Sequence, residues 1–344
     1  MSLTAVTVPQ YMRAATNSAI EYVRRFAAPQ CDVVDLFAPV DTTSTTQKGR
    51  YLKLVGPNVN GQSPNKQQIR KSILQQIQVR GMNFVEVTHE VIEWSDSYVL
   101  GRGQIATGGR IGMGNIEQIA ADSLATSSQI WLEDAFVAAI TGNSWANDYT
   151  GAGNGYWNDA NFNLVKALQD AAFAQKQKAN GKYPNTLILA QDTFNALAAN
   201  PSVIALHGTA PYYRSIDATQ AALQGIFSQA NDGKPLPFRI AVGRATKQSS
   251  GDLADGSETQ TAIVPSGFAF LCYTPVDDGG NFREDVSLED NCALKTIVAE
   301  DYRTKIEEIP GTGGTQGLFA MHNMDVVQTN ANAGTKWTSV LSAT

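Results

Sequence analysis

Cysteine is scarce in this sequence of 344 residues. The three cysteines, Cys31, Cys272 and Cys292, are odd in number and far apart, and no C-x-x-C motif occurs. A disulfide framework and a structural zinc site both need several cysteines at suitable spacing, so we expect neither. The pattern suits a protein that folds in a reducing cytoplasm.

Histidine is equally scarce, and the common catalytic motifs are missing. His89, His207 and His322 share no motif, and neither H-E-x-x-H nor G-x-S-x-G occurs. Catalysis by a zinc ion or a serine triad therefore has no local support in the sequence. We expect no enzymatic activity, no catalytic residue, no metal site and no cofactor.

Charge is low as well. Charged residues make up 17% of the chain, against about a quarter in a typical protein, and the formal net charge is -6. A protein that coats nucleic acid through its phosphates needs clustered Lys and Arg, so this composition does not favour that role. Because the cores of protein interfaces are depleted in charge, we expect part of the surface to be buried against partners.

Long apolar runs are missing too. No run approaches the 18 residues that a membrane-spanning helix requires, and the first residues, MSLTAVTVPQ, have neither the basic nor the apolar region of a signal peptide. We therefore expect no contact with a membrane. The hydrophobic content of 43% is nevertheless sufficient for a sizeable core.

Two strand-like segments flank a loop within residues 49–98. The first, GRYLKLVG, begins at Gly49, and the second, NFVEVTHEVIEW, begins at Asn83. The second alternates, with Val85 and Val87 on one face and polar residues on the other, which is typical of a half-exposed strand. We expect a long projecting β-ribbon, which needs a partner surface because two strands alone bury too little apolar area.

The ribbon contains the candidate residues for contacts between chains. Because its charged positions alternate with apolar ones, we expect one face to pack on a neighbouring chain and the other to stay polar. In this interpretation Leu54, Val85 and Val87 are buried together between chains. The full set of contact candidates is Arg50, Lys53, Leu54, Val85, Glu86, Val87 and Glu90.

A glycine-rich segment precedes a long helix. Residues 101–115 contain six glycines, and apolar residues recur at helical spacing over 115–141. Gly101, Gly103 and Ala106 fit G-x-G-x-x-A, but a dinucleotide-binding turn opens directly into its helix, and this helix begins too late. Since glycine permits backbone angles closed to other residues, we interpret the segment as a hinge. The hinge candidates are Gly108, Gly109, Gly112 and Gly114.

The stretch NTLILAQDTFNALAANP, residues 185–201, predicts a buried strand at 186–190 and a helix at 193–199. We expect Asp192 to be the N-cap of this helix; a catalytic carboxylate at the strand end is the alternative.

Other segments predict a simple sequence of elements. Helices are expected at 161–179 and 218–229, the second with Asp217 as a possible N-cap, and extended segments fill 281–330. DLADGSE at 252–258 faintly resembles a calcium loop, but its aspartate spacing does not fit the alternating ligand pattern, so we expect a surface turn.

In this order the elements resemble the major capsid protein of tailed phages, which has the Hong Kong 97-like fold. The resemblance covers most of residues 40–330. It rests on the helix NIEQIAADSLATSSQIWLEDAFVAAITGN, the two ribbon segments, TLILAQDTFNALAANPSVIAL, and GFAFLCYTPV followed by the strands of 292–328.

The resemblance implies an α+β Hong Kong 97-like capsid fold with an N-terminal arm, an extended β-ribbon loop, a long spine helix, and peripheral and axial domains. The implied limits are 1–48 for the arm, 49–98 for the ribbon loop, 99–190 with 281–330 for the peripheral domain, 191–280 for the axial domain and 331–344 for a C-terminal tail. The spine helix is expected at 115–141.

The resemblance also implies a function. A capsid protein of this kind self-assembles as hexamers and pentamers into the icosahedral head around a double-stranded DNA genome, without sequence-specific DNA contacts. Its expected partners are a separate scaffolding protein, a portal and decoration or cement proteins. It would be made in the bacterial host cytoplasm and reside in the virion. Lys48, Lys53, Lys66 and Lys71 lie in or beside the ribbon, but nothing singles one out for a cross-link between chains.

Three alternatives remain open. The first is an encapsulin-like shell, which shares the fold and encloses protein cargo. The second is a soluble hydrolase that uses Asp192 or Asp134. The third is a phage tail or adhesion protein, which the long helix and the lack of repeats make a weaker interpretation.

Overall fold

The structure is a computed structural model, and it describes most of the chain beyond the N-terminal region. The described residues are 40–41, 48–54, 84–90, 92–100, 116–179, 183–207, 215–230, 237–248, 260–277, 282, 285–286, 292–308 and 316–342.

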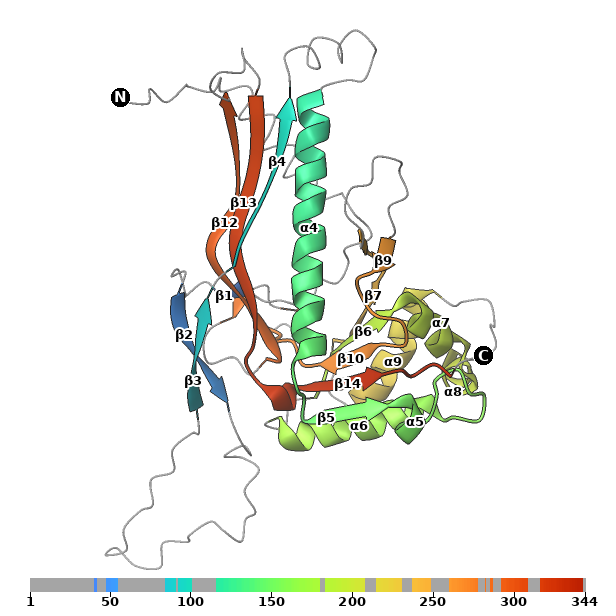
Figure 1. The fold of residues 1–344 in the computed structure, drawn as a ribbon. Helices are drawn as coiled ribbons and strands as arrows, with labels where there is room; N and C mark the ends of the chain where they lie inside the picture. The colour runs from blue at the N-terminus through green and yellow to red at the C-terminus, as the bar shows by residue number, and fades with distance from the viewer. Residues whose placement is uncertain are drawn as a thin grey trace, which may run out of the picture.

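The larger of the two main sheets is long and narrow (Figure 1). Its five strands follow the order β11-β1-β12-β13-β4, and β13 pairs antiparallel with both β12 and β4. The helix α4 (Ile116–Gly142) runs along this sheet. The strands are β1 (Val40–Asp41), β4 (Ile92–Leu100), β11 (Asp285–Val286), β12 (Leu294–Glu308) and β13 (Gln316–Gln328).

The smaller sheet also has five strands, in the order β5-β14-β10-β6-β7. These are β5 (Asn147–Thr150), β6 (Thr186–Ala190), β7 (Arg239–Gly243), β10 (Ala269–Cys272) and β14 (Gly334–Thr338). The helices around it are α5 (Gly151–Asn154), α6 (Leu164–Lys178), α7 (Gln191–Ala199), α8 (Pro201–Ile204) and α9 (Ile216–Ala230), with short 3-10 turns η3 (Ala205–His207) and η4 (Ala331–Ala333). Two separate hairpins are formed by β2 (Lys48–Leu54) with β3 (Phe84–Glu90), and by β8 (Thr246–Gln248) with β9 (Gln260–Ala262).

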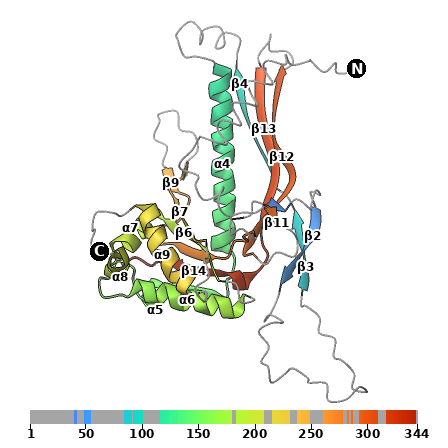
Figure 2. The ribbon, with the colours of Figure 1, turned by 180° about the vertical axis from the view of Figure 1, so that it is seen from behind.

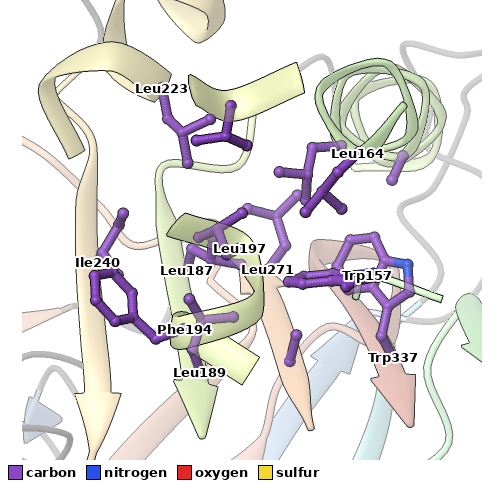
Figure 3. Close-up of a cluster of buried hydrophobic side chains, with 14 of the residues drawn as sticks. Trp157, Leu164, Leu187, Leu189, Phe194, Leu197, Leu223, Ile240, Leu271 and Trp337 are labelled. Atoms are coloured by element: carbon purple, nitrogen blue, oxygen red, sulfur yellow. The ribbon is translucent and has the colours of Figure 1, made fainter. Parts of the chain in front are cut away.

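Strand β6 shows why the sequence around it is continuously apolar. All five of its residues are buried, because the smaller sheet is covered on both faces. Leu187 and Leu189 point into one core cluster, and Ile188 and Ala190 point into another. The first cluster packs the sheet against α6, α7 and α9, and Figure 3 shows Leu197, Trp157 and Trp337 within it.

The opposite face of the smaller sheet receives the end of α4. Phe136, Val137 and Ile140 of α4 are buried there together with Ile188 and Phe270 of the sheet. Closer to its other end, α4 packs on the larger sheet, where Ala120 and Leu124 are buried against Leu318 and Ala320, with Trp94 beside them. The same helix therefore contributes to the cores of both sheets. Figures 1 and 2 show it running along the larger sheet, with one end at the smaller sheet.

The principal elements confirm the sequence predictions, with shifts at the ends. The helix expected at 115–141 is α4, the helix expected at 161–179 is α6, and the strand expected at 186–190 is β6. NFVEVTHEVIEW is extended as expected, but it contributes to two sheets, because β3 pairs with β2 whereas β4 pairs with β13.

Two further expectations need correction. Asp217 is not the N-cap of α9; the Oγ of Ser215 accepts a hydrogen bond from the backbone N–H of Ala218 instead, at 3.1 Å. Residues 331–344, expected as a C-terminal tail, contain β14, which lies between β5 and β10 in the smaller sheet. Gly334 permits this close packing, since a Cβ there would lie 2.4 Å from the ring of Trp145.

Asn200 joins two helices and a loop. It ends α7 and caps α8, with its Oδ1 accepting from the backbone N–H of Ser202 at 3.0 Å. Its Nδ2 also donates to the carbonyl oxygens of Trp157 at 3.1 Å and Phe162 at 3.2 Å. The Asn200 side chain is buried, so these carbonyl oxygens would lose their hydrogen bonds without gaining water if the side chain were removed.

We predict that Asn200→Ala lowers the free energy of unfolding by roughly 2–4 kcal/mol, because it removes a helix cap and leaves buried carbonyls unpaired. Urea unfolding of the subunit measures this change. The matched control is Asn195→Ala at an exposed position of α7, expected to stay within about 0.5 kcal/mol. Equal stability of the two variants would contradict this assignment.

Candidate assembly site

The ribbon of β2 and β3 brings together all seven contact candidates. The strands are antiparallel, with Lys53 opposite Val85 and Tyr51 opposite Val87. The ribbon lies beside one end of the larger sheet, on the side away from α6 and α9 (Figures 1 and 2). It therefore stands apart from the smaller sheet and its helices.

The register changes the expected faces of the ribbon. Residues directly opposite share a face, and successive residues alternate between faces. Leu54 is opposite Phe84, so it belongs to the other face from Val85 and Val87, and the single apolar face expected from the sequence is wrong. In this register each face combines apolar and charged positions of the sequence.

The hinge candidates Gly108, Gly109, Gly112 and Gly114 lie outside the described residues, as do the G-x-G-x-x-A segment and DLADGSE. The hinge stays a prediction.

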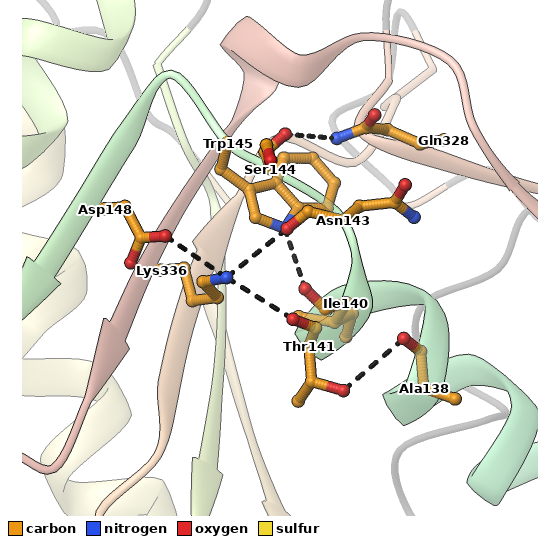
Figure 4. A network of polar contacts seen from close by, with 9 residues as sticks. All are labelled: Ala138, Ile140, Thr141, Asn143, Ser144, Trp145, Asp148, Gln328 and Lys336. Atoms are coloured by element: carbon orange, nitrogen blue, oxygen red, sulfur yellow. Dashed lines mark hydrogen bonds and ion pairs between the residues drawn. The ribbon is translucent and has the colours of Figure 1, made fainter.

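The C-terminal end of α4 is held by a lysine from a distant strand (Figure 4). The last turn of α4 contains no basic residue. The Nζ of Lys336 in β14 donates to the carbonyl oxygens of Thr141 at 3.4 Å and Asn143 at 3.3 Å, and lies 3.2 Å from the Oδ2 of Asp148. A cation at this position is favourable because helix carbonyls concentrate negative potential there.

Other side chains bind further carbonyls at this junction. Trp145 Nε1 donates to the carbonyl of Ile140 at 2.8 Å, and Asn143 Nδ2 donates to that of Ala139 at 2.7 Å. Gln328, at the end of β13, donates to the carbonyl of Ser144 at 2.9 Å. The last carbonyls of a helix lack partners within the helix, so Trp145 and Asn143 pair two of them, and Gln328 joins the segment after the helix to the larger sheet.

The two candidate catalytic carboxylates are engaged in structural contacts. Asp134 pairs with Lys247 of β8, with 2.6 Å between Oδ1 and Nζ. Asp192 accepts hydrogen bonds from the backbone N–H of Thr193 at 2.7 Å and from the hydroxyl of Ser266. The N-cap assignment of Asp192 is wrong, because α7 begins at Gln191 and Asp192 lies inside its first turn, where it joins the helix to the segment before β10.

A buried thiol and a half-buried guanidinium, Cys272 and Arg239, lie at one end of the smaller sheet. Burial raises the pKa of the Cys272 thiol to about 12, so it stays protonated at neutral pH and is a poor nucleophile. Burial lowers the pKa of Arg239 to about 10, which still leaves it charged. The Arg239 guanidinium stacks on the ring of Phe282, 3.9 Å from the ring centroid.

The described ranges contain neither a metal-binding cluster nor a membrane-spanning helix. No group of three or more His, Cys, Asp or Glu there is placed to hold a metal ion. Among the same residues, no helix is both long and apolar enough to cross a membrane.

Comparison with solved structures matches nearly the whole chain. A phage-related protein from Bordetella bronchiseptica RB50 gives a TM-score of 0.66 over 95% of this chain and 98% of its own, at 14% sequence identity. The capsid of Myoviridae phage XM1 gives a TM-score of 0.51 over 88% of this chain and 89% of its own, at 9% identity. The chain has the fold of tailed-phage capsid proteins.

The capsid fold confirms the expected α+β class. A virus-like particle from Pyrococcus furiosus is also similar, with a TM-score of 0.50 over 96% of this chain and 100% of the other, at 10% identity. No protein-family model matches the sequence, and a comparison with curated proteins gives no match.

Lys336, which binds carbonyls at the end of α4, was not among the residues predicted from the sequence. Its position in an expected tail carried no charge pattern that pointed to a helix. Only an indirect feature of the sequence pointed to such a residue. The helix of 27 residues has no basic residue in its last turn, so a cation from elsewhere in the fold would be favourable there.

We predict that Lys336→Met, which keeps the aliphatic stem and removes the ammonium group, lowers the free energy of unfolding by about 1–3 kcal/mol. Lys166→Met is the control, since Lys166 forms an exposed pair with Asp170 within one helix and should contribute at most about 0.5 kcal/mol. Denaturant unfolding of both variants measures the difference. If the two variants match in stability, Lys336 does not anchor α4.

Proposed function

We propose that this chain is a coat protein that assembles with copies of itself, as hexamers and pentamers, into the icosahedral head of a tailed phage. The observation that carries the proposal is the match to the phage-related protein at a TM-score of 0.66 over almost the full length of both chains. The similarity to the XM1 capsid supports the same assignment. In this proposal the protein is a structural subunit of the virion and not an enzyme.

The limits implied by the capsid resemblance become part of the proposal. The arm spans 1–48, the ribbon loop 49–98, the peripheral domain 99–190 with 281–330, and the axial domain 191–280. The smaller sheet draws strands from both sides of residue 190, so the limit between peripheral and axial domains stays a prediction.

The ribbon is the proposed contact between subunits. Its two strands form a sheet of their own, separate from the two main sheets, and its register places apolar positions on both faces. A two-stranded ribbon of this kind is marginal in water on its own. A neighbouring subunit that covers one or both faces would provide the missing apolar contacts.

Partners beyond the chain itself are proposed by the same reasoning. A separate scaffolding protein, a portal and decoration or cement proteins would act with the shell, and DNA would be packaged inside it without sequence-specific contacts. An encapsulin-like shell is the second candidate, favoured by the similarity to the Pyrococcus furiosus virus-like particle. The contents of the particle separate the two: phage DNA or enclosed protein cargo.

We predict that the purified protein forms closed shells without nucleic acid. The net charge of -6 gives the coat no excess of basic groups to condense DNA, and residues 1–48 contain four basic and four acidic residues. The basic residues are Arg13, Arg24, Arg25 and Lys48, and the acidic residues are Glu21, Asp32, Asp35 and Asp41. Sedimentation and negative-stain microscopy after nuclease treatment test this. A monomer or dimer under all conditions would refute a shell, and strict dependence on DNA would refute the charge argument.

We also predict that Val85→Ala combined with Val87→Ala weakens the shell by roughly 1–3 kcal/mol for each shortened side chain at the interface, while the melting temperature of the free subunit stays nearly unchanged. The measurements are shell dissociation in denaturant and subunit melting. Leu52→Ala with Leu54→Ala probes the other face of the ribbon.

Val203→Ala is the positive control for a core position, since Val203 is fully buried within the subunit and its truncation should lower subunit melting. If the Val85 and Val87 double variant behaves like Val203→Ala and leaves the shell intact, the ribbon belongs to an intramolecular core.

A further inference from the structure

The hairpin β8–β9 stands beside α4 (Figures 1 and 2). It is inserted between β7 and β10 of the smaller sheet. Its base is fixed, because Ile263 N donates to the carbonyl of Ala245 at 3.0 Å and both residues are buried in the core that also contains Phe136 of α4. Its second strand, Gln260–Ala262, is exposed throughout. The hairpin is thus held in the core at its base, and its second strand is exposed to solvent.

Strand β8 contacts α4 through a charged pair. The Nζ of Lys247 lies 2.6 Å from the Oδ1 of Asp134, and the two side chains are 43% and 37% exposed. An ion pair with this much exposure is screened by salt and opens at little cost. Asp134 interrupts the row of apolar residues along α4, and the structure shows that this aspartate pairs with Lys247.

The pair acts at a distance from the anchor of the helix. Thr141, whose carbonyl accepts a hydrogen bond from Lys336, is seven positions after Asp134. Seven positions correspond to about 10 Å along the helix. Hydrogen bonds hold the helix at this end, and Phe136 and Val137 pack it on the smaller sheet between the two points. The charged pair adds a second polar attachment, which opposes tilting of the helix about its end.

We propose that Lys247 and Asp134 form a salt-sensitive latch that fixes the tilt of α4 relative to the smaller sheet, with the Lys336 junction as the pivot. The larger sheet moves with α4, because the hydroxyls of Tyr98 and Ser123 are 2.8 Å apart and Trp94 packs near Trp131, with ring centroids 6.5 Å apart. The latch therefore sets the angle between the two sheets. The inference rests on the fold and does not depend on the proposed shell function.

Hydrogen exchange of the full chain, followed by mass spectrometry, tests the latch. In Lys247→Gln, the amides of β8–β9 and of residues 130–142 in α4 should exchange about two- to fivefold faster than in the unmodified protein. About 1 M NaCl should produce the same change in the unmodified protein and no further change in Lys247→Gln. The double variant Lys247→Asp with Asp134→Lys should restore protection, and Lys166→Gln, which breaks the exposed pair within α6, should leave these amides unchanged.

Amides of β6 report global stability and should not change in any of these variants. The latch is refuted if residues 130–142 keep their protection in Lys247→Gln, or if only the hairpin is affected. It is also refuted if β6 loses protection to the same extent, because the pair would then contribute to global stability and not to the tilt of α4. Failure of the charge-swapped variant to restore protection would likewise overturn it.

Discussion

The contact of Lys336 with the last carbonyls of α4 is the constraint on which the arrangement of the two sheets depends. The helix shares apolar contacts with both cores, and directional hydrogen bonds add to this packing at its end. Hydrogen bonds from Lys336, Trp145 and Gln328 give the end of the helix and the chain after it a definite position. Because Lys336 belongs to β14 and Gln328 to β13, each sheet provides one of these attachments.

The ribbon of β2 and β3 lies to one side of this junction (Figure 1). The smaller sheet is covered on both faces by its own helices and by α4, so it is complete within one chain. The ribbon is a two-stranded sheet of its own, and each face of its register has apolar positions. In the proposed shell, a neighbouring subunit would add the apolar contacts that a two-stranded ribbon lacks.

Elements with strong local patterns could be predicted from the sequence. The apolar run of β6 and the helical period of α4 indicated correct positions, because burial on both faces and burial along one stripe each impose a recognisable pattern. The ribbon strands were also predicted, but their shared faces were not, because the pairing of Leu54 with Phe84 depends on register.

Contacts between distant parts of the chain could not be predicted in the same way. The local sequence around Asp192 fits a helix cap, whereas its carboxylate binds Ser266, 74 residues further along the chain. Lys336 acts on carbonyls 193 and 195 residues away. Strand β14 is short and has little pattern of its own. It can lie beside Trp145 only because Gly334 has no side chain, and this role of the glycine becomes apparent only in the folded structure.

A cryo-electron microscopy reconstruction of the assembled particle, at side-chain resolution, would show directly what the ribbon contacts. We expect β2 and β3 of each subunit to lie against another copy of the chain, while Lys336 contacts the end of α4 in every copy. A ribbon packed on its own subunit, or an α4 end separated from β14, would contradict this expectation.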